Sequence, residues 1–192
     1  AVLIKEEEEP SNIFFLLEGR VKLSINSVEG RRLILGIAGP GEILGLASAI
    51  SGCPYEVTAE AYFPCRISSL DRDRFLNFLE RYPIACQNVA RELSLDSRRT
   101  FEQLRTLGLT LSAPAKLARL LLDWCAEGEL TELGIRIQCA LTHGEIGEHI
   151  GVSRETVTRS LNEFKSQGLV ERRGTTLLVP SRTALAFYAG NR

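Results

Sequence analysis

The sequence predicts an α+β fold in three parts: an N-terminal β-roll (jelly roll), a long helix and a C-terminal winged helix-turn-helix. Three observations predict this order. Short apolar runs separated by turns fill residues 13–69, an apolar stripe at helical spacing follows over 84–111, and two short capped helical patterns lie within 141–164. The expected domain limits are 1–82, 83–111 and 112–192.

The N-terminal region alternates short apolar runs with turn residues. Runs at 13–17, 21–25 and 33–37 are separated by turns that contain glycine, and a Gly-Pro-Gly turn at 39–41 follows the last run. Short strands at regular spacing with such turns are typical of a β-barrel or roll.

The segment from about 84 to 111 predicts one long helix. Its apolar residues recur at helical spacing, with Ser97 and Gly108 as small positions, and a stripe of this kind is usually core. The stripe consists of Val89, Leu93, Phe101, Leu104, Leu107 and Leu111. Ser112-Ala113-Pro114 marks a hinge, with Pro114 close to the start of the next helix, which is expected over 115–126.

The segment from Leu141 to Leu161 is the most informative part of the chain because it predicts two short helices joined by a tight turn. Thr142 with Glu145 three residues later forms a capping box, which marks a helix start. Gly151 suits the left-handed conformation that ends a helix, and Ser153 suits the N-cap of the second helix.

The apolar residues of this segment predict how the two helices pack. Val157, Leu161 and Phe164 recur at helical spacing and are expected to pack on the first helix, and Gly147 is expected to let the two helix axes approach closely. This leaves four side chains facing outward on the second helix: Arg154, Glu155, Thr158 and Arg159.

These four residue types can read base pairs in a major groove. Arginine matches guanine O6 and N7, glutamate accepts from the cytosine N4 amino group, and a threonine methyl can lie against thymine. The alternative is a solvated face in a helical hairpin, where Arg and Glu form weak local ion pairs. The agreement of cap, turn, buried positions and outward side chains favours DNA binding.

Residues 169–179 predict a small hairpin that follows the second helix. Two short strands turn at Arg173-Gly174, and the basic tip is placed to reach a phosphate. Lys165 and Arg172 add positive charge beside it. Exposed arginines in a hairpin are more often simply solvated, so both interpretations stay open for Arg173.

The helix-turn-helix resembles that of the Crp/Fnr superfamily of bacterial transcription factors, which includes the cyclic-AMP receptor protein and the fumarate-nitrate regulator. The shared pattern is Glu-Ile-Gly, Ile-Gly, Ser-Arg-Glu-Thr-Val and Arg, here at 145–159. The resemblance places Arg154, Glu155 and Arg159 on base-reading positions. It places four other residues at backbone or phosphate contacts: Thr142, His143, Ser153 and Thr156.

The resemblance also implies partners and a setting. The expected assembly is a homodimer in which the helix of 83–111 pairs with its twin as a parallel coiled coil, and the hinge passes changes in the sensor to the DNA-reading heads. The expected partners are a two-fold DNA operator with TGTGA-like half-sites and RNA polymerase. The expected location is the cytoplasm, with no membrane contact.

Over its visible length, the N-terminal part resembles the family's cyclic-nucleotide-binding-like sensor domain, but its ligand residues differ. Leu46 stands where nucleotide-binding members carry a ribose-binding glutamate, and Glu56-Val57 stands where they carry the phosphate-binding Arg-Ser. A carboxylate in place of arginine repels a phosphate, so the usual mode of cyclic-AMP binding is disfavoured. The candidate pocket for another small effector, or for none, is formed by Gly45, Leu46, Ala47, Ser48, Glu56, Val57 and Thr58.

Composition indicates a water-soluble protein, and its net charge of −1 fits DNA binding only when it is divided by region. The 192 residues are 44% hydrophobic, and neither an apolar membrane span nor a signal peptide is evident. Residues 1–139 hold 16 Lys and Arg against 19 Asp and Glu, whereas residues 140–192 hold 7 against 5, so the net charges are −3 and +2. DNA affinity is therefore expected to depend on salt and on dimerisation. Because the chain begins at Ala1 and contains no methionine, N-terminal residues are expected to be missing.

Cofactor and enzyme interpretations are disfavoured. The five cysteines lack a C-x-x-C pair, and the cysteine cluster of iron-sulfur members is absent. Cys139, His143 and His149 lack the spacing of a structural zinc site. Both histidines lie outside the sensor, which disfavours histidine-ligated haem, whereas ligation through Cys53 or Cys65 stays open without a supporting signal. No nucleophile elbow or phosphate loop suggests an enzyme. A signalling module that acts through protein contacts remains the alternative to a DNA-binding regulator.

Overall fold

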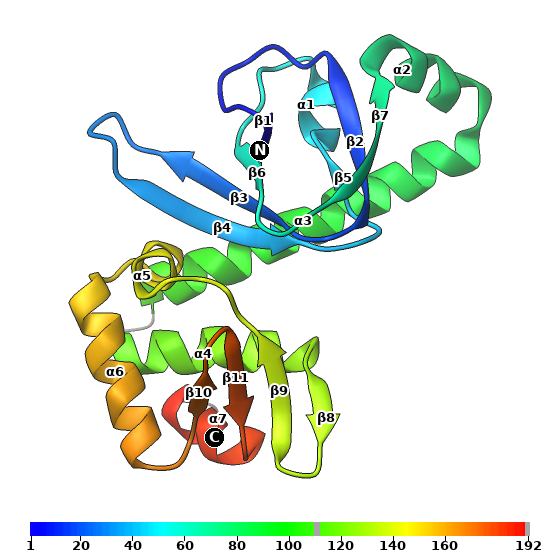
Figure 1. Cartoon of the computed structure of the whole chain (residues 1–192). Helices are drawn as coiled ribbons and strands as arrows, with labels where there is room; N and C mark the ends of the chain where they lie inside the picture. The colour runs from blue at the N-terminus through cyan, green and yellow to red at the C-terminus, as the bar shows by residue number, and fades with distance from the viewer. Residues whose placement is uncertain (110–111, 191–192) are drawn as a thin grey trace. The chain divides into compact units, whose positions relative to one another are not determined.

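The computed structural model describes residues 1–109 and 112–190 (Figure 1). The chain divides into two compact units, Ala1–Glu102 and Gln103–Arg192. Leu111 of the predicted apolar stripe lies outside the described residues. Among the described residues, no helix is both long enough and apolar enough to cross a membrane.

The first unit is a roll of two antiparallel sheets, as predicted. Its strands are β1 (Val2–Ile4), β2 (Asn12–Glu18), β3 (Val21–Asn26), β4 (Arg32–Ala38), β5 (Ile43–Leu44), β6 (Thr58–Ala61) and β7 (Arg66–Asp71). One sheet has the order β1-β6-β3-β4 and the other β5-β2-β7. The three apolar runs became β2, β3 and β4, and left-handed glycines at Gly19 and Gly41 set the turns beside them.

Two apolar clusters fill the first unit. One contains Ile4, Leu16, Val21, Ala38, Leu44, Tyr55 and Ala59. The other joins β2 to the helices α1 (Leu46–Ser51), α2 (Arg72–Arg81) and α3 (Pro83–Leu109), and contains Ile13, Leu46, Ala49, Phe75, Leu79 and Val89. The Tyr55 hydroxyl donates to the Asn12 carbonyl at 2.6 Å, which satisfies its polar end inside the roll.

The predicted apolar stripe divides into two parts along α3. Val89 is 9% exposed and packs with Leu93 in the second cluster, so this part of the stripe is core. Phe101 is 62% exposed and Leu104 is 58% exposed. The C-terminal part of the helix therefore presents large apolar side chains on the surface of the single chain.

The second unit is a winged helix-turn-helix, as predicted. Its elements are α4 (Ala113–Ala126), β8 (Glu129–Thr131), β9 (Gly134–Gln138), α5 (His143–Ile150), α6 (Arg154–Ser166), β10 (Glu171–Arg173), β11 (Thr176–Val179) and α7 (Arg182–Tyr188). The sheet order is β10-β11-β9-β8, and α4 contacts α5, α6 and α7. The sequence patterns had not delimited β8, β9 or α7. Ser112 caps α4 by accepting from the Ala115 amide at 3.3 Å, so this helix begins two residues before the predicted start.

Candidate nucleic-acid interface

Local sequence signals set the ends of α5 and α6 as expected. The Thr142 hydroxyl accepts from the Glu145 amide at 3.2 Å, and the Glu145 carboxylate accepts from the Thr142 amide at 3.0 Å. Gly151 ends α5 with a φ of 68°, and the Ser153 hydroxyl accepts from the Thr156 amide at 3.2 Å. The predicted capping box, glycine turn and N-cap are therefore all confirmed.

Gly147 lies where the turn and the start of α6 approach α5 closely. A β-carbon at this position would lie 2.5 Å from the Val152 carbonyl oxygen, which belongs to the turn between the helices. The turn backbone makes the tightest contact, and the start of α6 comes next, with Ser153 C at 3.4 Å and Arg154 N at 3.5 Å from the same β-carbon position. Any larger residue must displace backbone atoms, so the path of the turn depends on this single position.

Buried apolar residues fix the rotation of α6 against its neighbours. Each of the following is at most 1% exposed: Ile146, Ile150, Val157 and Phe164. Leu161 is 8% exposed and continues the same face. Since these side chains bury one face of α6, the opposite face must point to solvent.

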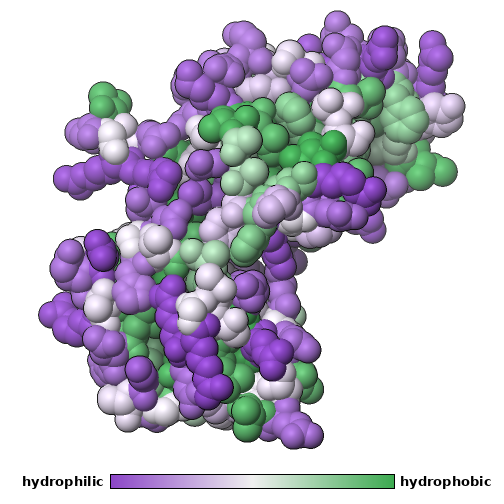
Figure 2. All heavy atoms as spheres, in the orientation of Figure 1, coloured by the Kyte–Doolittle hydropathy of each residue, from purple (hydrophilic) through white to green (hydrophobic). Residues whose placement is uncertain are grey.

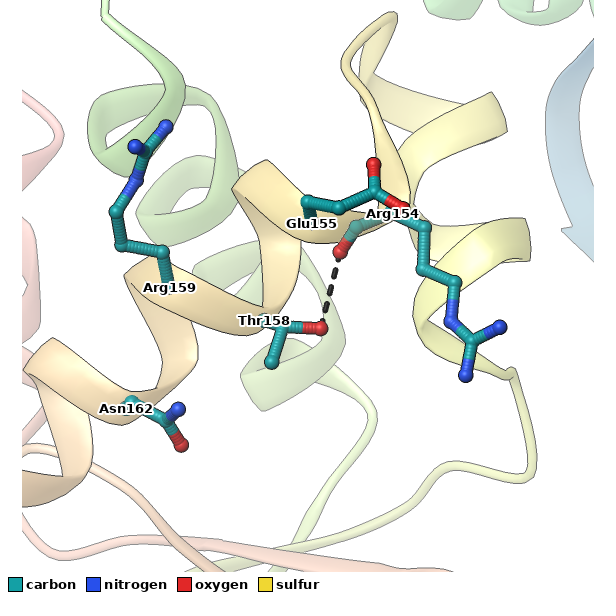
Figure 3. Close-up of a pocket in the computed structure, with 5 residues that line it drawn as sticks. All are labelled: Arg154, Glu155, Thr158, Arg159 and Asn162. Carbon is teal, nitrogen blue, oxygen red and sulfur yellow. Dashed lines mark hydrogen bonds between the residues drawn. The ribbon is translucent and has the colours of Figure 1, made fainter.

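The outward face of α6 gathers five side chains around one open pocket (Figure 3). Arg154, Glu155, Thr158 and Arg159 all line it, so the four residues predicted to face outward lie together. Asn162 also lines the pocket and had not been predicted. Its spacing of four residues from Thr158 and eight from Arg154 is the sequence signal that would have found it.

This face is polar and carries both charges. The surface over α6 is mainly hydrophilic (Figure 2). The pKa of Glu155 is lowered by a hydrogen bond from its own backbone amide, by a second from the Ser153 hydroxyl and by the positive charge of Arg154. Glu155 is therefore an ionised acceptor at neutral pH, between two arginine donors on the same helix.

His143 and Thr158 join the two helices through their side chains. His143 Nδ1 lies 2.8 Å from the Thr158 hydroxyl, which also donates to the Arg154 carbonyl at 3.0 Å. Burial lowers the pKa of His143, and the positive charges of Arg172 and Arg154 lower it further. The ring nitrogen nearest α6 is thus already engaged within the chain, which the sequence did not predict.

The other predicted phosphate-contacting hydroxyls also take part in caps. The Thr142 hydroxyl donates to the Glu145 carboxylate at 3.0 Å, and the Ser153 and Thr156 hydroxyl oxygens lie 3.1 Å apart. All four predicted phosphate-contacting residues of the helix-turn-helix lie at the start of a helix, where exposed backbone amides favour anions.

The wing turns one residue later than predicted. Arg173 pairs with Thr176, so the loop consists of Gly174 and Thr175. The Arg173 side chain is 80% exposed and lies 3.2 Å from the Glu171 carboxylate. Arg172 instead points back, and its guanidinium donates to the carbonyls of Gly174 at 3.2 Å and Leu141 at 3.4 Å. Arg172 thereby ties the wing to the segment just before α5.

In the first unit, the residues of the predicted effector pocket have mixed environments. Leu46 is 3% exposed and packs in the core, so it supplies no polar group to a ligand. The buried Ser48 hydroxyl lies 3.3 Å from both the Pro54 carbonyl and the Glu56 carboxylate. The Thr58 hydroxyl accepts from the Glu6 amide at 3.2 Å. Gly45, Ala47 and Val57 lie beside these residues in the sequence, and the effector pocket itself stays a prediction.

In the part of the chain that the structure describes, the cysteines, histidines and acidic residues show no grouping typical of a metal centre. Within residues 1–109 and 112–190, no set of three or more His, Cys, Asp or Glu side chains is placed to hold a metal ion. The five cysteines are not in disulfides. Burial raises the pKa of Cys139 and of Cys125, which keeps both thiols protonated at neutral pH.

Comparison with known families assigns both units. Residues 1–82 match the model described as a cyclic nucleotide-binding domain, and residues 115–188 match the model described as a Crp-like helix-turn-helix domain. In Mycobacterium tuberculosis H37Rv, a protein named CRP-like cAMP-activated global transcriptional regulator is 29% identical over 182 residues, which cover 94% of this chain and 81% of that protein.

Solved structures show the same arrangement of elements. A CRP-family transcriptional regulator from Thermus thermophilus, TTHB099, is 26% identical with a TM-score of 0.81, covering 99% of this chain and 93% of that chain. FixK2 from Bradyrhizobium japonicum has a TM-score of 0.87 at 20% identity, covering 98% of this chain and 92% of that chain. At that identity the second likeness shows the fold alone.

Proposed function

Because this chain belongs to the Crp/Fnr family of transcription regulators, we propose that its second unit reads double-stranded DNA with the outward face of α6. The single observation that carries this proposal is the set of five polar side chains around one open pocket on that face. A helix that buries one face and presents Arg, Glu, Thr and Asn on the other is suited to a major groove. The similar proteins cited are named as transcription regulators.

The hydrogen-bonding groups and methyl group of this face each suit a particular base. Arg154 and Arg159 are assigned to guanine O6 and N7, and the ionised Glu155 to the cytosine N4 amino group. The Thr158 methyl suits thymine, and the Asn162 amide suits adenine. A TGTGA-like half-site contains these bases on its two strands, so it is the proposed target sequence.

Phosphate contacts are proposed for the rim of this face. Thr142 and His143 lie at the start of α5, and Ser153 and Thr156 lie at the start of α6. Arg173 is proposed to contact the backbone from the wing because its side chain is 80% exposed at the edge of the hairpin. Such contacts fix the position of the protein on the duplex without reading sequence.

The functional unit is proposed to be a homodimer that pairs through α3. The support is the exposed part of the stripe, since Phe101 and Leu104 leave apolar surface open on a helix whose N-terminal part packs on the roll. Two copies related by a two-fold axis match a two-fold operator. RNA polymerase is the proposed protein partner and the cytoplasm the proposed setting, as expected for a bacterial transcription regulator.

We propose that the first unit does not take cyclic AMP through the usual residues, although the names of several relatives describe them as cAMP-activated. Leu46 is core, and Glu56 places a carboxylate beside Ser48, where a phosphate would be repelled. Another small effector is the proposed input. Saturable cyclic-AMP binding at micromolar concentration in a calorimetric titration would overturn this part.

The DNA-reading proposal is tested by comparing specific and random DNA. A binding site is first selected from random duplexes with the purified protein, and the dissociation constants of variants are then measured on that site and on a scrambled duplex. Arg159→Ala should cost about 1 to 3 kcal/mol on the selected site and relax one base position, because a bidentate guanine contact is lost.

Arg31→Ala serves as the control because Arg31 is exposed in the first unit, between β3 and β4. It should leave both affinities unchanged. Equal losses on selected and scrambled DNA in Arg159→Ala would show that this side chain contacts phosphate and does not read a base.

A further inference from the structure

His143 and Thr158 form an uncommon pair across the helix-turn-helix. His143 is the first residue of α5, whereas Thr158 lies in the second turn of α6 and lines the proposed base-reading pocket. The Nδ1 atom of His143 lies 2.8 Å from the Thr158 hydroxyl oxygen. The same hydroxyl donates to the Arg154 carbonyl, four residues earlier on α6, at 3.0 Å.

Proton counting fixes the direction of these two bonds. A hydroxyl carries one proton, and the Thr158 proton is used toward the Arg154 carbonyl because a carbonyl can only accept. Thr158 must therefore accept from His143, so the histidine carries its proton on Nδ1. The second ring nitrogen, Nε2, is left outside this contact. Protonation of Nε2 would add a charge without breaking the bond to Thr158.

The two bonds hold the threonine in one rotamer. Threonine in a helix ordinarily divides between two χ1 rotamers, because its hydroxyl can bond a carbonyl of the preceding turn. Here the hydroxyl has an acceptor in its own helix and a donor from α5, so rotation would break both bonds. Figure 3 shows the hydroxyl turned toward the Arg154 carbonyl and the methyl carbon directed away from it.

We propose that His143 is a positioning residue for sequence specificity: it holds the Thr158 hydroxyl against the Arg154 carbonyl, so that Thr158 presents its methyl group to DNA and selects the 5-methyl of thymine. The inference rests on the proposed function of α6. A free hydroxyl can donate to or accept from several bases and discriminates poorly, whereas a methyl group discriminates by apolar contact with thymine.

The neighbouring wing supports the position of His143. Arg172 of β10 donates to the Leu141 carbonyl, two residues before His143, and to the Gly174 carbonyl of the wing turn. The backbone before α5 is therefore held from two sides, by Arg172 and by the capping box of Thr142 and Glu145. A ring that begins from a fixed backbone can orient its partner more strictly than one on a mobile loop.

The test replaces thymine by deoxyuridine, which removes only the 5-methyl group. The probe is the selected duplex, and each thymine of the half-site is replaced in turn, symmetrically in both half-sites. Wild-type protein should lose affinity at one position, by about fourfold per half-site and about fifteenfold for both, as expected for one buried methyl group. Other thymines should show little change.

Four variants separate positioning from other roles. Thr158→Ser keeps the hydroxyl and removes the methyl, so it should lose the thymine preference, and Thr158→Val keeps a methyl group and should retain it. His143→Ala should also lose the preference. His143→Asn should restore it because the asparagine amide can donate from nearly the same place as Nδ1. A purely structural role for His143 would change thermal stability but not the ratio of thymine to deoxyuridine affinity.

The outcomes distinguish this inference from the proposed function. If His143→Ala weakens binding equally on thymine and deoxyuridine duplexes, the positioning role is overturned and a phosphate contact is left. If wild-type protein is indifferent to every deoxyuridine substitution but still selects a sequence, the inference fails while the proposed function stands. If wild-type protein selects no sequence at all, the proposed function fails.

Discussion

Replacing Leu104 by alanine should weaken the dimer more than the fold of the single chain. Leu104 is 58% exposed on α3, so less than half of its side chain contributes to the stability of one chain. Full burial of a leucine side chain stabilises by about 1.5 to 3 kcal/mol, so burying the exposed part contributes about 1 to 2 kcal/mol. A two-fold interface contains this side chain twice, which gives about 2 to 4 kcal/mol per dimer.

That free energy corresponds to a dimer dissociation constant raised by about 30-fold to 1000-fold. Sedimentation equilibrium over a range of protein concentrations measures it directly, and thermal unfolding at a concentration where the chain is monomeric measures the fold. Leu109→Ala is the matched control, because Leu109 is 76% exposed on the same helix but lies five residues on, about 140° around its axis. It should leave dimerisation unchanged. Equal effects of the two substitutions, or none from Leu104→Ala, would refute pairing through this stripe.

Three further predictions concern the DNA-binding unit. Arg173→Ala should lower affinity equally on specific and scrambled DNA, because a phosphate contact is lost. The slope of log affinity against log salt concentration should fall by about one per half-site. An unchanged slope would show that the wing does not contact DNA. Operator affinity should rise as the pH falls from 7 toward the lowered pKa of His143. Phosphates near the ring offset the positive charges of Arg172 and Arg154, so the pKa of His143 is higher in the complex and the bound protein takes up protons. His143→Asn should flatten that dependence at constant salt, and a profile unchanged by this substitution would contradict the assignment, since His149 is present in both proteins. Gly147→Ala should lower the free energy of unfolding of this unit by about 1 to 3 kcal/mol in denaturant, because its β-carbon would meet the Val152 carbonyl at 2.5 Å. Gly144→Ala is the control, since its β-carbon meets nothing closer than 3.7 Å, and it should lower that free energy far less.

The pH prediction has a counterpart in folding stability. The pKa of His143 is lowered in the folded chain, so the unfolded chain binds the proton more readily. Its contribution to stability is therefore complete above the unfolded pKa of 6.5 and is lost as the pH falls through the lowered folded value. Operator phosphates near the ring are expected to oppose this trend, because they favour the protonated histidine in the complex. Unfolding measured with and without the operator should therefore diverge as the pH is lowered.

The first unit shows where sequence patterns were sufficient and where they were not. The runs that became β2, β3 and β4 were predicted because the side-chain period of a strand is local and glycine marks the turns. β1, β5 and β6 are only two to four residues long, too short for a period to be seen. The α3 stripe was predicted, but its division at Val89 and Phe101 between core and exposed surface depends on where the roll ends against the helix.

The sequence by itself determined the features that depend only on residues within about one helical turn of each other. The Thr142 capping box, the left-handed Gly151, the Ser153 N-cap and the outward face of α6 follow from hydrogen bonds and periodicity over three to five residues. From these and the resemblance they carry, the family and the DNA-binding role could be predicted. The resemblance alone also indicated that Leu46 and Glu56 depart from the usual ligand residues.

Only the tertiary structure decided which side chains meet across the turn. His143 and Thr158 are 15 residues apart, and their contact exists because the buried faces of α5 and α6 set one angle and one rotation between the helices. The same packing placed Asn162 beside the predicted base-reading residues and put the Val152 carbonyl against Gly147. Neither a local period nor a cap specifies an angle between helices, because that angle results from the volumes of all the side chains packed between them.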